Sequence, residues 1–244
     1  MKRFLILQLR PETDAADAEF ASILDKCGLS ADRVHRIRLD REDLPDGLDV
    51  GDYAGVIVGG GPGCVSDDPA TKSPLDARME AAVMGLMPQI TAHDHPFMGC
   101  CYGLGVLAAH LGGKVSKARY SEPVGPSDCT LTEDALHDPL TRGLDREFQA
   151  FVGHKEAVQE LPPGCVHLVA SEPCPIQMVR WGRNVYATQF HPEADARDFE
   201  QRIHIYKDHG YFPSQDAERL IAICHSAEVN QPGQILRRFA QRYG

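Results

Sequence analysis

Short apolar runs and longer segments with helical spacing follow one another along the first part of the chain. Residues 3–9 predict a strand, residues 15–28 a helix, and residues 34–39 a second strand in which apolar and basic residues alternate. Residues 53–58 form another apolar run, which opens into the glycine-rich stretch 59–63. This order predicts a βαβ beginning and a buried parallel strand that ends in a loop, where sites in α/β proteins gather.

The pattern continues for about fifty residues and then changes. A helix is predicted over about 74–90, a strand over 96–100, and a helix from Leu104 to Leu111 that ends at a glycine pair. From 114 to 190, short β-like stretches are separated by Pro and Gly. We therefore expect antiparallel strands added to the parallel sheet.

The last part of the chain has helical spacing over residues 197–209, 214–228 and 232–242. No internal repeat, low-complexity tract or long linker divides the sequence, and its 244 residues suit one large domain. We expect a single domain over residues 1–244, with a C-terminal helical extension from about residue 197.

Composition narrows the classes of partner. The net charge of −10 would repel phosphate backbones and anionic lipid headgroups, and no cluster of Lys and Arg offsets it, so neither nucleic acid nor membrane is expected as a partner. No apolar run approaches the roughly 20 residues that cross a bilayer, and the N-terminal run is interrupted by polar residues. The eight cysteines include no CxxC pair, which favours reduced thiols in the cytoplasm.

One of these cysteines lies in a motif with chemical meaning. The segment from Gly99 to Gly103 fits G-x-C-x-G, the thiol counterpart of the nucleophile elbow, with Cys101 at its centre. A nucleophile on a tight strand-to-helix turn has strained backbone angles, and small residues two before and two after it let strand and helix pass. The helix that follows would lower the pKa of the Cys101 thiol, while Cys100 should point into the core.

Such a pentapeptide alone is more often structural, so its context matters. Residues 186–190 form an apolar strand that leads to His191, and Glu193 follows two residues later. A thiol nucleophile needs a base to take its proton and a third group that orients the base. His191 and Glu193 are candidates for these two roles.

Together with Gly60-Gly61-Pro62, these segments resemble the class I glutamine amidotransferases, and most closely the glutaminase domain of GMP synthetase. The three motifs occur in the family's order, and the resemblance covers about residues 50–195. It implies an α/β fold, a flavodoxin-like open and mostly parallel sheet with helices on both faces, and a site at the carboxyl ends of the strands.

The resemblance also implies roles for individual residues. Cys101 would form a γ-glutamyl thioester, with His191 and Glu193 completing the catalytic triad. The backbone N–H groups of Gly61 and Tyr102 would form the oxyanion hole. His191 would give its proton to the leaving ammonia, and water or an acceptor would then complete the reaction.

Two positions depart from the family's pattern near the expected substrate site. The segment 151–155 resembles a loop whose main chain helps to hold the substrate, but Gly153 replaces the usual serine before His154. Gly105 stands where the family has a glutamine that binds the amino-acid end of the substrate. A lost hydrogen bond of this kind costs about 0.5–1.5 kcal/mol net, and a larger γ-glutamyl compound could use the space that Gly105 opens.

No metal or cofactor is expected. The segment His93-Asp94-His95 has no third ligand nearby in the sequence, and residues 59–63 lack the Lys-Ser/Thr of a phosphate-binding loop. The expected partners are a small γ-glutamyl substrate, with glutamine favoured, and a separate synthetase or acceptor protein. Two alternatives remain open: a γ-glutamyl peptidase that acts on larger γ-glutamyl compounds, and a catalytically silent regulatory paralogue.

Overall fold

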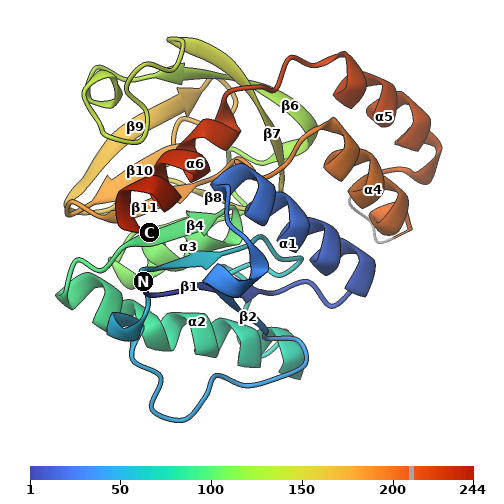
Figure 1. Ribbon diagram of the computed structural model, residues 1–244. Coiled ribbons are helices and arrows are strands. Elements are labelled where there is room, and N and C mark those ends of the chain that lie inside the picture. The colour runs from blue at the N-terminus through green and yellow to red at the C-terminus, as the bar shows by residue number, and fades with distance from the viewer. Residues whose placement is uncertain (209–211) are drawn as a thin grey trace.

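A nine-stranded sheet crosses the molecule in the strand order β2-β1-β3-β4-β11-β10-β9-β6-β7 (Figure 1). The computed structural model describes residues 1–208 and 212–244. Five neighbouring strands are parallel: β1 (Phe4–Gln8), β2 (Val34–Arg38), β3 (Gly55–Val58), β4 (Phe97–Cys100) and β11 (Val185–Thr188). Their apolar sequences match strands that are buried on both faces.

The other half of the sheet is antiparallel. It contains β10 (Met178–Trp181), β9 (Cys165–Ser171), β6 (Glu122–Leu131) and β7 (Glu147–His154). A second, two-stranded sheet pairs β5 (Val115–Ser116) with β8 (Ala157–Val158). The antiparallel strands predicted over 114–190 are present, with β11 as the exception. This strand pairs in parallel with β4, so both strands end at the same edge of the sheet.

Helices cover both faces of the parallel strands. On one face, α1 (Thr13–Cys27) and α6 (Pro232–Tyr243) pack together over a core that includes Phe4 and Ile6. On the other face, α2 (Pro74–Ala92) and α3 (Tyr102–His110) cover a core that includes Leu5 and Leu7. Successive side chains of a strand point to opposite faces, so one apolar run supplies both cores.

The three C-terminal helices do not form one unit. Helix α6 packs beside α1 on the sheet, whereas α4 (Ala196–Tyr206) and α5 (Ala217–Ser226) pack against each other and share a small core with Phe151 of β7 (Figure 1). Position 209, the predicted end of the first of these helices, lies outside the described residues. Short 3₁₀ turns occupy Ala31–Arg33, Val50–Asp52, Asp134–Leu136 and Ser214–Asp216.

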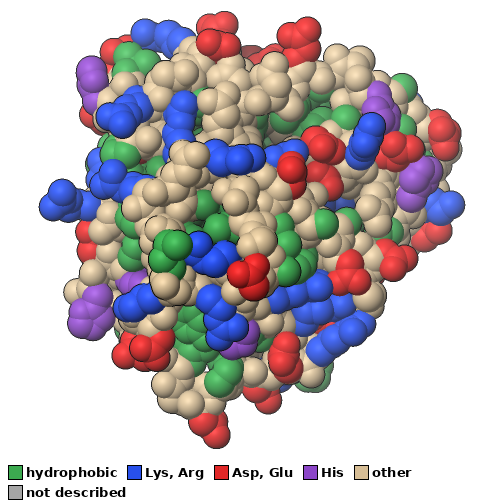
Figure 2. Space-filling model, in the orientation of Figure 1, with side chains coloured by type: hydrophobic (Ala, Val, Ile, Leu, Met, Phe, Trp, Pro, Cys, Tyr) green, Lys and Arg blue, Asp and Glu red, His purple; other side chains and the backbone are tan. Residues whose placement is uncertain are grey.

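The surface carries both signs of charge. Figure 2 shows Lys and Arg side chains interspersed with Asp and Glu over the face in view. Within residues 1–208 and 212–244, no helix is long and apolar enough to cross a membrane.

Candidate active site

The turn between β4 and α3 holds Cys101 in a strained conformation. Its φ of 53° and ψ of −90° lie in a region that residues with a side chain rarely adopt, and its backbone N–H is held by the carbonyl of Thr188 at 2.7 Å. A Cβ atom on Gly99 would lie 2.7 Å from the carbonyl carbon of Gly103. Position 99 therefore requires glycine, whereas a Cβ on Gly103 would meet only Val58 at 3.6 Å, so the second glycine of the motif has no comparable steric need.

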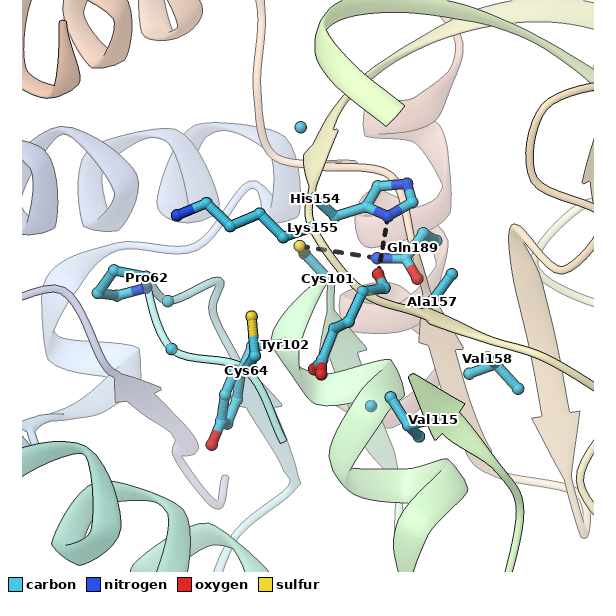
Figure 3. A pocket seen from close by; sticks show the side chains of 15 residues that line it. Pro62, Cys64, Cys101, Tyr102, Val115, His154, Lys155, Ala157, Val158 and Gln189 are labelled. Atoms are coloured by element: carbon cyan, nitrogen blue, oxygen red, sulfur yellow. Dashed lines mark hydrogen bonds between the residues drawn. The ribbon is translucent and has the colours of Figure 1, made fainter. Parts of the chain in front are cut away.

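The two adjacent cysteines differ in their surroundings. Cys100 is fully buried among the core residues of the α1 and α6 face, as predicted. Burial raises the pKa of the Cys101 thiol to about 12, so the expectation that the helix dipole lowers this pKa was wrong. Desolvation is the largest cause of this rise in pKa, and it favours the protonated thiol at neutral pH. The side-chain amide of Gln189 lies 3.8 Å from Sγ (Figure 3).

His191 follows the end of β11 and lies at the same sheet edge as Cys101. Its Nδ1 is 2.8 Å from Oε1 of Glu193, and both side chains are buried. Burial lowers the pKa of His191, so the imidazole is neutral and Nε2 is left for proton transfer. Cys101 and His191 line one pocket, although no hydrogen bond joins them in the described part of the chain. Such contacts often tighten only when substrate binds.

A chain of buried charges lies behind this pair. Nη2 of Arg202, from α4, is 2.8 Å from Oε1 of Glu193. Burial alone would raise the pKa of Glu193, but His191 and Arg202 together hold that pKa well below its usual range. Arg202 also lies 4.0 Å from Glu19 of α1, and Glu19 pairs with Arg10 at 2.8 Å.

The expected oxyanion hole lies beside the sulfur. Gly61 and Tyr102 line a pocket together with Cys101 (Figure 3). Among the described residues, neither backbone N–H has a hydrogen-bond partner, and Tyr102 is the first residue of α3, where such amides are free by geometry. The Tyr102 hydroxyl donates to Glu80 at 2.8 Å, which anchors the side chain away from the sulfur. The assignment of the oxyanion hole stays a prediction.

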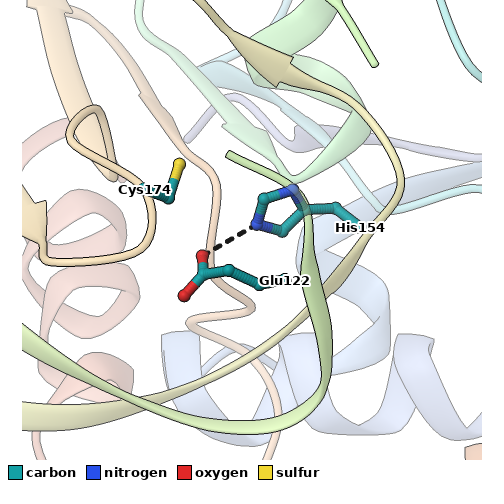
Figure 4. Close-up of side chains that lie close together, drawn as sticks. All are labelled: Glu122, His154 and Cys174. Atoms are coloured by element: carbon teal, nitrogen blue, oxygen red, sulfur yellow. Dashed lines mark hydrogen bonds and ion pairs between the residues drawn. The ribbon is translucent and has the colours of Figure 1, made fainter. Parts of the chain in front are cut away.

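Gly153 and His154, which were expected in a loop, are instead the last two residues of β7 and border the same pocket. Nδ1 of His154 is 2.8 Å from the carbonyl oxygen of Glu156, and Nε2 is 2.9 Å from Oε2 of Glu122 (Figure 4). Both ring nitrogens of His154 thus lie within hydrogen-bond distance of an oxygen. The His154 side chain therefore holds the end of β7 in place, and Gly153 offers its main chain to the pocket.

Cys174 lies close to the same histidine, and the three possible metal-ligand atoms of Glu122, His154 and Cys174 lie within 4.8 Å of one another. Glu122 is already hydrogen-bonded, because it accepts from Ser127 and from Gln177 at 2.6 Å each. These contacts account for the buried carboxylate, and we assign no metal to the cluster.

Glu156 occupies the space that Gly105 was expected to open. A Cβ atom at position 105 would lie 3.2 Å from Oε1 of Glu156 and 3.2 Å from Val65. The Glu156 carboxylate accepts from the backbone N–H groups of Val65 and Ser66, at 2.8 Å each. A carboxylate from the loop after β7 thus lies against the position where the family has a glutamine.

Sequence reasoning missed five side chains near the site: Arg10, Glu19, Glu156, Gln189 and Arg202. The sequence held a signal for two of them: Arg10 lies two residues after the end of the buried strand β1, and Glu156 directly follows the quoted segment 151–155. Arg202 lies in a segment beyond the motifs, where the resemblance gave no guidance.

Comparison with known proteins identifies the family. Residues 16–207 match the family model described as glutamine amidotransferase class-I. The chain belongs to the class I glutamine amidotransferases. The family predicted from the three motifs is thereby confirmed, and with it the enzyme class.

Individual relatives agree with this family. The chain is 30% identical to one subunit of the glutamine-hydrolyzing GMP synthase of Natronomonas pharaonis over 156 residues, which are 64% of this chain and 72% of that protein. It is 30% identical to the glutamine-hydrolyzing GMP synthase of Thermosipho melanesiensis over 150 residues, which are 61% of this chain and 26% of that protein. This amidotransferase thus spans about a quarter of the longer relative.

Solved structures confirm the predicted fold class. A glutamine amidotransferase from Thermotoga maritima superimposes with a TM-score of 0.76 at 21% identity, covering 100% of this chain and 99% of that one. A glutamine amidotransferase from Methylobacillus flagellatus superimposes with a TM-score of 0.71 at 21% identity, covering 100% and 94%. The mixed sheet, with helices on both faces of its parallel strands, is therefore the class I amidotransferase fold.

Proposed function

We propose that this amidotransferase hydrolyses a γ-glutamyl carboxamide through a triad of Cys101, His191 and Glu193. The observation that carries the proposal is the pairing of His191 with a buried, ionised Glu193 at the sheet edge where the strained turn presents Cys101. A thiol presented by a strained turn near a neutral, oriented imidazole suits nucleophilic catalysis.

The chemistry follows from the protonation states. The Cys101 thiol gives its proton to Nε2 of His191 as Sγ attacks the amide carbon, and the amide oxygen takes the negative charge beside Gly61 and Tyr102. The C–N bond breaks as His191 returns the proton to the leaving nitrogen, which leaves a γ-glutamyl thioester on Cys101. Water then attacks the thioester, the C–S bond breaks, and glutamate and the thiol are released.

Substrate recognition involves Glu156 in this proposal. Glu156 lines the pocket next to Cys101, and each of its two carboxylate oxygens accepts one hydrogen bond, from the backbone N–H of Val65 or of Ser66. An ionised carboxylate can accept up to about four hydrogen bonds, so it can also hold the α-ammonium group of a glutamyl substrate. Gly153 and Lys155 line the same pocket, where they would meet the α-carboxylate.

A partner protein and a cytoplasmic setting complete the proposal. The relative from Natronomonas pharaonis is named as one subunit of its GMP synthase, which supports a separate synthetase as the user of the ammonia. All eight cysteines are unpaired, which supports a reducing compartment. Co-purification of a tagged chain with a synthetase that raises its glutaminase rate would test the partner, and full activity with no partner would count against it.

The first experiment is ammonia release from glutamine and amine release from γ-glutamyl amides, with Cys101→Ala as the control. Turnover that the substitution abolishes supports the triad. A silent regulatory protein would show no turnover and would leave Cys101 unlabelled by an electrophilic glutamine analogue. Labelling without turnover would instead point to activity that needs a partner.

The alternative substrate class is larger γ-glutamyl compounds. Glu156 fills the space beside Gly105, so extra room for a substrate must lie elsewhere around Cys101. Equal or better turnover of free glutamine than of γ-glutamyl peptides would exclude this alternative.

A further inference from the structure

A second pocket opens on the His191 side of the nucleophile. Three residues, Gly61, Cys101 and Gly153, line both this pocket and the one that contains Glu156, so the two meet at the sulfur. His191 lines only the second pocket, whereas Gly105 and Glu156 line only the first. If the proposed function holds, the leaving nitrogen must approach His191 and therefore enters the second pocket.

The charges that face this second pocket are positive. Arg10 and Arg202 line the pocket. The carboxylates that pair with them, Glu19 and Glu193, have fully buried side chains and do not line it. The residues Arg10 and Arg202 are only 6% and 8% exposed. Nη1 of Arg202 is buried and has no hydrogen-bond partner among the described residues. Two arginine side chains on one wall of a pocket favour a ligand that carries a negative charge.

The rest of the wall is apolar and aromatic. It is formed by Val124, Phe199, Ile203, Tyr206 and Phe212, which come from β6, from α4 and from the segment that follows α4. Ammonia, the leaving group from glutamine, is small and needs neither an apolar wall nor two cations. The lining fits a larger amine that has an apolar body and a carboxylate.

We propose that this second pocket, between β6 and α4, binds the leaving amine of a γ-glutamyl amino acid or peptide, with Arg10 and Arg202 holding its carboxylate. The substrate then lies across Cys101, its glutamyl end toward Glu156 and its amino-acid end toward the two arginines. The reaction is hydrolysis of the γ-glutamyl amide bond: the C–N bond breaks, one water is consumed, and glutamate and a free amino acid are released.

The test compares two substrates that differ only in the carboxylate, γ-glutamyl-leucine and γ-glutamyl-isoamylamide. We expect kcat/KM to be roughly tenfold or more in favour of γ-glutamyl-leucine, as a charge-assisted hydrogen bond predicts. Arg10→Gln and Arg202→Lys should both move this ratio toward one. The ratio is measured on one protein sample, so partial unfolding or a weakened triad affects both substrates equally.

A matched control is Arg180→Gln, which removes a half-buried arginine, on β10, that lies outside the pocket and pairs with Asp138. It should keep the wild-type ratio. A ratio near one in the wild type, or a high ratio that survives both pocket variants, would overturn the inference while leaving the hydrolase proposal intact.

A binding measurement separates this inference from the proposed function if turnover is slow. Calorimetry with the Cys101→Ala protein should show about tenfold tighter binding of γ-glutamyl-leucine than of the isoamylamide. Equal affinities would refute the second pocket as a carboxylate site. Absence of both turnover and binding for every γ-glutamyl compound would refute the pocket and the hydrolase function together.

Discussion

At the scale of single residues, the surroundings of Cys101 favour a protonated thiol. Burial raises the pKa of Cys101 to about 12, and burial also keeps His191 neutral. The resting pair is thus thiol and imidazole rather than thiolate and imidazolium. In the proposed mechanism the proton moves only when substrate is attacked, so the sulfur of the free enzyme should react slowly with other electrophiles.

This protonation state predicts how the free enzyme reacts with iodoacetamide. Only the thiolate reacts, and its fraction rises about tenfold for each pH unit below the pKa. Alkylation of Cys101 should therefore accelerate steadily from pH 6 to pH 10, without a plateau. Mass spectrometry of the modified peptide measures the rate, with Cys101→Ala as the control for the other cysteines. A plateau below pH 8 would show an ion pair with His191 at rest.

Glu156 carries a second prediction at this scale. In Glu156→Gln the charge that would meet the substrate's α-ammonium is lost, so KM for the glutamyl substrate should rise roughly 10- to 100-fold, as expected for a hydrogen bond between charged groups. The effect on kcat should be smaller, because the triad is not touched. Steady-state kinetics measures KM and kcat separately, and an unchanged KM would show that Glu156 does not bind the substrate.

Sequence alone identified the nucleophile, base and orienting carboxylate as candidates because each lies within a short motif. It could not identify Arg202 or Glu156 as neighbours of those residues. Arg202 reaches Glu193 only because α4 packs back toward α1, and Glu156 reaches Gly105 only through a loop after β7. Such contacts depend on tertiary packing, which no local spacing encodes.

At the scale of elements, the site depends on how closely α3 passes β4. The carbonyl group of Gly103 lies against Gly99, so the strand and helix leave no room for a methyl group. Gly99→Ala should therefore force the turn apart and destabilise the protein by about 1–3 kcal/mol, the usual cost of overpacking. Glutaminase activity should fall with it, because Cys101 would move.

The matched control is Gly85→Ala in the middle of α2, where a Cβ atom would meet nothing within 4 Å. Here the change should stabilise the protein by about 0.5–1 kcal/mol, because alanine loses less conformational entropy than glycine in a helix. Urea unfolding and activity assays of both variants give the comparison. Equal stability of the two would contradict a steric requirement at position 99.

Much of the element order was predictable because apolar runs and breakers mark it clearly. The strands and helices of the first 113 residues begin and end within a few residues of their predicted limits. The direction of β11 was not predictable, since its pairing with β4 bridges more than eighty residues. The different positions of α4, α5 and α6 were not predictable either, because all three segments have the same helical spacing and their packing partners are distant in the sequence.

At the scale of the whole molecule, buried charges connect the site to distant elements. The charges form a line that alternates in sign and consists of Arg10 after β1, Glu19 on α1, Arg202 on α4 and Glu193 after β11. Each of these four residues is less than 9% exposed. Leaving one member without its partners would expose a buried charge to a low dielectric, which typically costs about 3–5 kcal/mol.

This arrangement makes stability depend on pH in a defined direction. His191 and Arg202 hold the folded-state pKa of Glu193 below its ordinary value, 4.5. The unfolded chain therefore takes up a proton at Glu193 at a higher pH than the folded chain does. The stabilisation is complete above the ordinary pKa and is lost as the pH falls toward the folded-state pKa.

Glu193→Gln removes the titrating carboxyl group, so the difference in the free energy of unfolding between the wild type and this variant isolates the contribution of Glu193. At pH 7 the wild type should be more stable by about 3 kcal/mol, because the variant leaves Arg202 without its charge partner. That gap in the free energy of unfolding should narrow as the pH is lowered from 5 to 3. Glu172→Gln, which changes an exposed glutamate, should show almost no gap at any of these pH values. A gap that stays constant over this range would mean that folding does not shift the pKa of Glu193, and a gap that widens as the pH falls would mean that Glu193 is protonated in the folded protein.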